Sequence, residues 1–271
     1  MNRNRKAGTS INRFPLSQTE YGIFTEQLSA VNTAYNIPFK IALSAEVDVE
    51  RLCSAIRAAM NAHPYLKTGF SLDKNGEAYK FLRDCEAEIP VIDADDFDIA
   101  SLIRPFDLQK DLLFRSAVIR SAAGVTLFLD IHHIIFDGTS ISLLLAHIDR
   151  AYRGETLTPE VFTANDYAIE EKERLSSEEY RAAKEYYRST FDGVDVDSSL
   201  FTDRNGRAPV AKEVVYPLSG IRAEALKAFA AEKHIKQSTV FNGAFAYLLS
   251  QYSGSEQVLY ATVYHGRDKR L

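Results

Sequence analysis

Hydrophobic and polar residues along this chain follow two periods, one typical of strands and one typical of helices. Strand-like runs are predicted at residues 35–43, 78–82, 113–119 and 125–133. Between them, helices are predicted from Asp48, a favourable N-cap, to His63-Pro64, and over residues 140–152 up to Gly154. Strands and helices of this mixed order predict an α+β fold.

The pattern changes near residue 166, where a charged helical segment extends to about residue 191. Such a segment is typical of a helix that links two packed units, and we therefore expect a domain boundary after it. Beyond it, we predict strands at residues 213–217 and 258–264 and helices at 221–231 and 239–252. The expected organisation is a leader or disordered segment at 1–12, a first domain at 13–191 and a second at 192–271. A second domain of about 80 residues is marginal by itself, so we expect it to be cut short or to need a partner.

Composition narrows the possible functions. With 46% hydrophobic and 25% charged residues, the chain can bury a core and is not of disordered type. The 32 basic and 37 acidic residues give a net charge of −5, which argues against nucleic acid as a partner. The sequence has no run of about 20 apolar residues, and we expect no membrane span. Cys53 lies on the apolar face of a predicted helix, which favours a reduced thiol and a cytoplasmic protein.

Candidate chemistry concentrates in the segment IHHIIFDG, which contains His132, His133, Asp137 and Gly138. If the strand continues to residue 133, alternation places His133 at the end of the apolar row formed by residues 125, 127, 129 and 131. A partly desolvated imidazole there would stay neutral and could accept a proton, as a general base must. Asp137-Gly138 is typical of a turn that returns a carboxylate towards the histidines, and Gly138 would let a substrate approach the backbone closely.

Other interpretations of this segment stay open. Both histidines can be structural, one packed in the core and one at the surface. A metal site would lack ligands, because adjacent strand residues point to opposite faces and leave one histidine with one carboxylate. Ser140 could be a nucleophile, but the chain has no GxSxG elbow, and Ser140 is better explained as a helix cap. No glycine-rich phosphate loop is present.

The segment from His132 to Gly138 resembles the HHxxxDG signature of the condensation domains of nonribosomal peptide synthetases, which belong to the chloramphenicol acetyltransferase-like acyltransferases. Further segments resemble other motifs of this family in the same order along nearly the whole chain. These are residues 14–17 with Glu20 and Gly22, residues 62–70, residues 105–108 with Arg115, residues 166–168 with 186–187, and residues 262–267. Glu20 departs from the family pattern, in which glutamine is usual at this place.

The resemblance implies a chloramphenicol acetyltransferase-like mixed sheet with flanking helices, in two lobes with a tunnel between them. Phosphopantetheine arms of carrier proteins would enter from both sides, and a donor acyl thioester would meet the acceptor amine at His133. Gly138 would be close to the oxyanion, and no metal or bound cofactor would be needed. The resemblance further implies four supporting residues and three that line the tunnel: His132, Asp137, Lys67 and Arg115 for support, and Ser140, Tyr264 and Arg267 for the lining. In the family Asp137 pairs with an arginine, whose place Lys67 takes here, so we expect a pair of Lys67 and Asp137.

Family members are considerably longer than this chain. We therefore expect an excised fragment with a complete first lobe and a partial second lobe, inactive by itself and open to self-association through unpaired sheet edges. The leading function is amide-bond formation in the full-length parent. The alternatives are an epimerising or ester-forming relative, and a non-catalytic platform that docks carrier or tailoring proteins.

Overall fold

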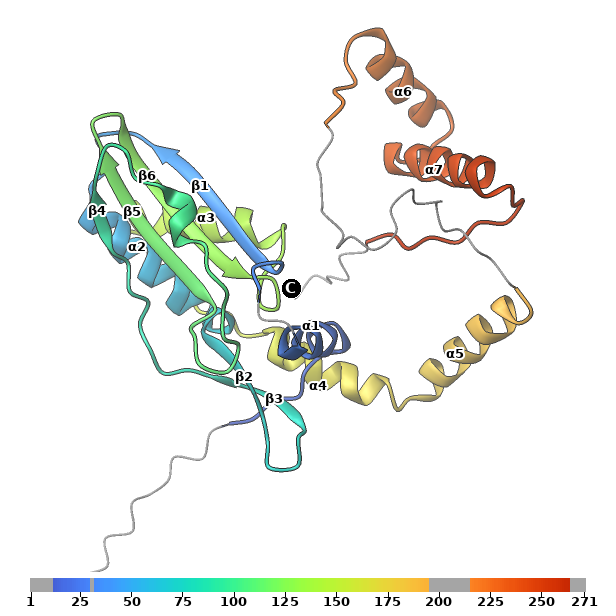
Figure 1. The fold of residues 1–271 in the computed structure, drawn as a ribbon, viewed down its shortest axis with the longest axis horizontal. Coiled ribbons are helices and arrows are strands. Elements are labelled where there is room, and N and C mark those ends of the chain that lie inside the picture. Colours follow the sequence, from blue (N-terminus) through green and yellow to red (C-terminus); the bar gives the residue numbers. More distant parts are fainter. Residues whose placement is uncertain (1–11, 30–31, 195–214, 264–271) are drawn as a thin grey trace, which may run out of the picture. The chain divides into compact units, whose positions relative to one another are not determined.

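The computed structural model describes residues 12–29, 32–194 and 215–263. The chain divides into two compact units, and the division falls between Ala183 and Lys184. The sequence placed a domain boundary eight residues later, after residue 191, and that boundary stays a prediction. Figure 1 shows the elements of each unit.

A four-stranded sheet forms the centre of the first unit (Figure 1). Its strand order is β1 (Asn36–Leu43), β6 (Gly124–His132), β5 (Phe114–Ser121) and β4 (Val91–Asp93). β4 runs parallel to β5 and the other neighbours are antiparallel, so the sheet is mixed. The α+β prediction is confirmed, and the predicted strands at 35–43 and 113–119 correspond closely to β1 and β5.

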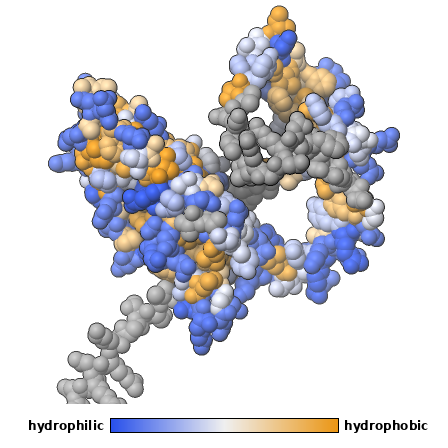
Figure 2. All heavy atoms as spheres, in the orientation of Figure 1, coloured by the Kyte–Doolittle hydropathy of each residue, from blue (hydrophilic) through white to orange (hydrophobic). Residues whose placement is uncertain are grey.

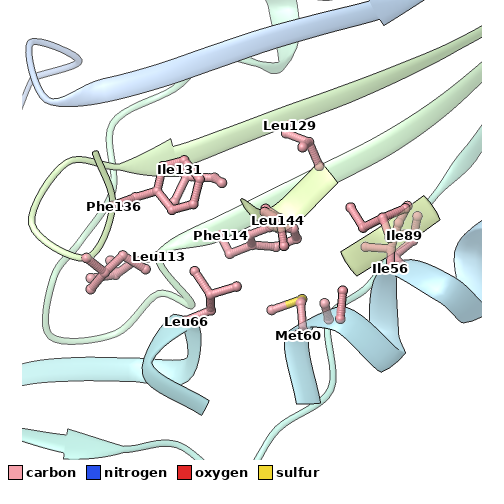
Figure 3. Close-up of a cluster of buried hydrophobic side chains, with 14 of the residues drawn as sticks. Ile56, Met60, Leu66, Ile89, Leu113, Phe114, Leu129, Ile131, Phe136 and Leu144 are labelled. Atoms are coloured by element: carbon pink, nitrogen blue, oxygen red, sulfur yellow. The ribbon is translucent and has the colours of Figure 1, made fainter. Parts of the chain in front are cut away.

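Two helices, α2 (Val49–Ala62) and α3 (Ser140–Tyr152), pack together and contribute to the main core with the sheet. Asp48 caps α2 as predicted, because its side chain accepts a hydrogen bond from the amide of Arg51. Figure 3 shows part of the hydrophobic core, where side chains of the strands meet those of the helices and loops. Its labelled members are Ile56, Met60, Leu66, Ile89, Leu113, Phe114, Leu129, Ile131, Phe136 and Leu144. Since Leu127, Leu129 and Ile131 alternate along β6, this face of the strand belongs to the main core.

The opposite face of the sheet packs against a smaller cluster. Ala117, Ile119 and Phe128 are its buried members, and the segment around the short helix η2 (Ile99–Leu102) covers them. Both faces of β6 are therefore buried towards its carboxyl end. This double burial is what places polar residues of β6 inside the protein.

A hairpin of β2 (Thr68–Leu72) and β3 (Ala78–Leu82) follows the short helix η1 (Pro64–Lys67). Helix α1 (Gln18–Ser29) is tied to this hairpin by a buried ion pair, in which Lys80 Nζ contacts the two carboxylate oxygens of Glu20 at 2.7 and 2.8 Å. Tyr65 donates its hydroxyl hydrogen to Glu20, and Lys80 also donates to the carbonyl of Ala164 at 3.0 Å. Four segments distant in the sequence thus meet at one buried charge pair.

The charged segment predicted at 166–191 forms two helices, α4 (Ala164–Arg174) and α5 (Glu178–Phe191). In the second unit, α6 (Ile221–Glu232) and α7 (Gln237–Ser253) confirm the two predicted helices. The predicted strands are wrong where they are described, because residues 215–217 and 258–263 form no strand. A strand needs a hydrogen-bonded neighbour, and the described part of this unit contains no strand that could provide one.

Hydrophobic side chains remain exposed on the helices of the second unit (Figure 2). On α7 they include Phe241, Tyr247, Leu248 and Tyr252. None of the helices in the described ranges is long and apolar enough to cross a membrane.

Candidate active site

The two adjacent histidines have opposite environments. β6 ends at His132, whose side chain is 0% exposed, whereas His133 lies in the following turn and is exposed. The prediction that His133 ends the apolar row of the strand is therefore wrong. The chain turns one residue earlier than the alternation implies, since the amide of Ile135 already bonds to the carbonyl of His132 at 3.1 Å. The backbone of His133 is nevertheless fixed, because its amide donates to the carbonyl of Tyr35 at 2.8 Å.

His132 shapes the turn that presents His133. Its Nδ1 accepts a hydrogen bond from the amide of Ile134 at 3.1 Å, so the proton of the neutral ring is on Nε2. The ring packs against Tyr35 and, edge-on, against Phe106, with centroid distances of 5.9 and 5.8 Å. Burial, together with His133 and Arg115, lowers the pKa of His132 to about 4. His132 is thus a neutral, buried hydrogen-bond acceptor that supports the turn.

Arg115 lies on β5 directly opposite Asp130 of β6. Its guanidinium bonds to Asp130 and Asp111, each at 3.3 Å, and to the carbonyls of Arg104 and Pro105. It also stacks on Phe106, with its central carbon 3.5 Å from the ring centroid. Burial raises the pKa of Asp130 although Asn36 and Arg115 oppose the shift. Arg115 therefore packs against the same aromatic ring as His132, which is compatible with its expected supporting role.

Asp137 and Gly138 end the turn and lead into α3. Asp137 Oδ1 accepts hydrogen bonds from the amide and hydroxyl of Ser140, at 2.9 and 2.7 Å. Ser140 is consequently the first residue of α3 and is itself held by Asp137, rather than being the cap as expected. Gly138 is exposed, and a side chain added there would meet no other atom within 4 Å. The loop beside His133 thus leaves space for a ligand to approach its backbone.

The expected pair of Lys67 and Asp137 is wrong. Lys67 ends η1, and its ammonium group bonds to Asn61 Oδ1 at 2.6 Å and contacts Glu86 at 3.5 Å. These acceptors lie beside the end of η1, so the lysine is used locally. Tyr264 and Arg267, which were expected to line a tunnel, fall outside the described residues.

Two residues that the sequence did not single out belong to this site. Asn36 of β1 donates from Nδ2 to Asp130 Oδ2 at 2.8 Å and to the carbonyl of Arg104 at 3.0 Å. Asp130 is 0% exposed. The available signal was a carboxylate inside an otherwise apolar strand, two residues before His132 and therefore on the same strand face.

A second pair of histidines lies near the same loop. His63 Nδ1 contacts Glu160 Oε1 at 2.5 Å, and His63 Nε2 contacts Nδ1 of His147 at 2.7 Å. A hollow of about 100 Å³ is lined by His63, Glu160, Phe136 and Ser140, among others. Burial and His63 lower the pKa of His147. The contact between His63 and His147 thus connects the end of α2 to α3.

Comparisons with known proteins agree on one family. The family model described as "Condensation domain" matches residues 12–270. The chain is 29% identical over 265 residues to surfactin synthase subunit 1 of Bacillus subtilis (strain 168), covering 94% of this chain and 7% of that protein. It is similar in fold to the first condensation domain of the calcium-dependent antibiotic synthetase, with a TM-score of 0.72 and 20% identity, over 91% of this chain and 63% of that one. The condensation domain from the Monacolin K polyketide synthase MokA gives a TM-score of 0.75 and 20% identity, over 90% and 61% of the two chains. The chain thus spans a small part of this synthase and less than two thirds of these solved domains.

Proposed function

Because this chain belongs to the condensation-domain family, we propose that the protein containing it forms amide bonds between carrier-bound substrates. Condensation domains of synthetases are acyltransferases. In the proposed reaction, the donor is an acyl or peptidyl thioester on one carrier and the acceptor is the amine of an aminoacyl group on another. The observation that supports this most directly is the different placement of the two histidines, since His132 is buried and supports the turn whereas His133 is exposed.

His133 is the residue to which we assign the proton transfer or the orientation of the amine. The amine nitrogen attacks the thioester carbonyl, a carbon–nitrogen bond forms and the carbon–sulfur bond breaks. His133 accepts the proton that the nitrogen loses, and the protonated imidazole then gives this proton to the departing thiolate. The fixed backbone of His133, bonded to Tyr35, would hold the imidazole at one place on the loop.

Gly138 is the residue that we place beside the developing oxyanion. It is exposed, and a Cβ atom added there would have no atom of a non-neighbouring residue within 4 Å, so a thioester carbonyl could approach the backbone of the loop. Asp137 and Ser140 would fix the geometry of that backbone through their mutual hydrogen bonds. We also retain Ser140, Tyr264 and Arg267 as candidates for lining the substrate tunnel.

The remaining parts of the proposal concern partners and location. Substrates would arrive on the phosphopantetheine arms of carrier domains, with no cofactor bound by this chain itself, and neighbouring synthetase domains would be the partners. Cys53 and Cys85 are free, which suits the reducing conditions of the cytoplasm. Because the chain covers only part of the solved domains, activity is assigned to the parent protein, and residues 192–271 to part of its second lobe.

The test is His133→Ala in the full-length parent, with amide formation and carrier binding measured separately. We expect turnover to fall by roughly 10²- to 10⁴-fold, the usual contribution of a general base, while carrier binding is retained. A matched control is His234→Asn, because His234 is exposed in the second unit and its positive φ of 54° favours asparagine over alanine. Unchanged turnover of His133→Ala would overturn the assignment of proton transfer to His133, whereas a parent protein that binds carriers but forms no amide would favour a docking platform. An ester product would instead identify an ester-forming relative, and an epimerised thioester would identify an epimerising relative.

A further inference from the structure

Three buried polar atoms near the turn that carries His133 have no hydrogen-bond partner among the described residues. They are Asn36 Oδ1, Asp130 Oδ1 and His132 Nε2. Asp130 and His132 are both 0% exposed, so solvent at the surface does not reach their side chains. Orphaned polar atoms are costly inside a protein, and three of them on neighbouring residues need an explanation.

The three side chains lie on one face of the sheet. Asn36 of β1 is directly opposite His132 of β6 in the strand register. Asp130 is two residues before His132, hence on the same face of β6, and it accepts a hydrogen bond from Asn36 at 2.8 Å. The node, as we name Asn36, Asp130 and His132, is therefore a set of adjacent side chains.

The chemical type of each orphaned atom is fixed by the bonds on the other end of its side chain. Asn36 uses its amide hydrogens for Asp130 and for the carbonyl of Arg104, so its Oδ1 can only accept. His132 accepts at Nδ1, so its Nε2 carries the hydrogen and donates. Asp130 Oδ1 is an acceptor, because Arg115 and Asn36 stabilise the carboxylate at its other oxygen. The node therefore offers one donor and two acceptors.

Surrounding groups close the node. Phe106 is 1% exposed and meets the ring of His132 edge-on, while Arg115 covers Phe106 and bonds to Asp130. The charged side chains at and around it are two acidic groups, Asp130 and Asp111, and two basic groups, Arg115 and Arg104, and Arg115 bonds to both aspartates. A charged ligand would upset this balance, whereas a small neutral ligand would not.

We infer that Asn36, Asp130 and His132 bind one buried water molecule. A water molecule can donate one hydrogen to Asn36 Oδ1 and the other to Asp130 Oδ1, and its lone pair can accept from His132 Nε2. Buried waters typically make about three hydrogen bonds of this kind. The water joins β1 to the end of β6, next to the hydrogen bond between Tyr35 and His133, and so stabilises the position of the loop. The inference does not depend on the proposed acyl transfer.

The test uses the 271-residue chain labelled with ¹⁵N-histidine and ¹³C-aspartate. At neutral pH we expect His132 in the Nε2–H form, with its Nε2 proton visible and showing cross-relaxation to a long-lived water. A crystal structure should show density for a water within hydrogen-bonding distance of all three atoms. A hydrogen-bond coupling from Nε2–H directly to the Asp130 carboxylate, or a dry node in the crystal, would overturn the inference.

A variant tests the contribution of Asn36. Asn36→Ala removes one of the three partners of the water, and we expect the Nε2 proton of His132 to exchange with solvent at least about tenfold faster. Asn32→Ala is the control, because Asn32 is an exposed asparagine just before β1 whose side chain, among the described residues, accepts a hydrogen bond from the amide of Ala34 alone. Equal exchange rates in Asn36→Ala and the original chain would show that Asn36 does not hold the water.

Discussion

The buried pair of Glu20 and Lys80 gives the sharpest test of how this fold is stabilised. The change Glu20→Gln keeps the size of the side chain and removes its charge. The side chain of Lys80 is 0% exposed and that of Glu20 is 8% exposed, so water cannot replace the lost carboxylate. Burial already lowers the pKa of Lys80 even though Glu20 opposes this shift. An uncompensated ammonium group would therefore remain inside the first unit.

The size of the effect follows from the geometry. Two unit charges at the 2.7 and 2.8 Å separations of Lys80 Nζ and the Glu20 oxygens attract by about 6 kcal/mol at an effective dielectric constant of about 20. The glutamine oxygen can still accept a hydrogen bond from Lys80, which offsets roughly half of this loss. We expect the free energy of unfolding to fall by about 3 kcal/mol, at the lower end of the range for breaking a buried pair. For a unit of this size the melting temperature should fall by about 6 to 12 °C.

The assay is thermal and urea unfolding of the chain, followed by circular dichroism. Glu173→Gln is a matched control, because Glu173 is exposed on α4 and its loss should change stability by less than about 0.5 kcal/mol. The double variant Glu20→Gln with Lys80→Met removes both charges and should recover much of the lost stability. If Glu20→Gln unfolds within about 0.5 kcal/mol of the original chain, the argument from the buried charge is refuted.

Two further predictions concern pH and association. His132 has a folded-state pKa of about 4 against 6.5 for the free side chain, so the unfolded state takes up a proton first as pH falls. The free energy of unfolding, measured with urea, should therefore be highest above pH 6.5 and fall by about 3 kcal/mol towards pH 4. In His132→Asn the part of this decrease that comes from His132 should be missing. Equal pH dependence in the variant and the original chain would contradict the argument from burial. The exposed hydrophobic side chains of α7, such as Phe241 and Leu248, predict concentration-dependent self-association in size-exclusion chromatography with light scattering, and a monomer at every concentration would count against it.

Many elements of the first unit could be predicted from the sequence because their hydrophobic patterns are strong, but α1, β2 and β4 were not predicted. α2 has apolar residues at helical spacing and an acidic N-cap, and its predicted start at Asp48 is correct. The second unit was harder, because residues 258–263 have the composition of a strand but form none. Whether an apolar run becomes a strand depends on a neighbour to pair with, and that neighbour is not a local property of the sequence.

The position of the candidate site along the chain could be predicted from the sequence, but the arrangement of its side chains could not. The sequence predicted that His132 and His133 have different environments, but the strand alternation assigned the apolar environment to the wrong histidine. The reason is that a turn hydrogen bond, from the amide of Ile135 to the carbonyl of His132, ends β6 at His132. Asn36 and Asp130 were missed because they are far apart in the sequence and meet only through the pairing of β1 with β6. Polar residues in strands are expected to face solvent, and only the second buried face of this sheet makes them internal.

The two departures from the family pattern have different structural consequences. By the resemblance of the sequence motifs, Lys67 stands where an arginine is expected, and its ammonium group bonds to Asn61 and contacts Glu86 instead of Asp137. By the same resemblance, Glu20 stands where a glutamine is expected, and it pairs with a buried cation, Lys80. A carboxylate at this depth would be costly alone, because burial disfavours its charged form. The glutamate and the lysine therefore have to be understood as one unit, in which either residue alone would destabilise the contact between α1 and the β2–β3 hairpin.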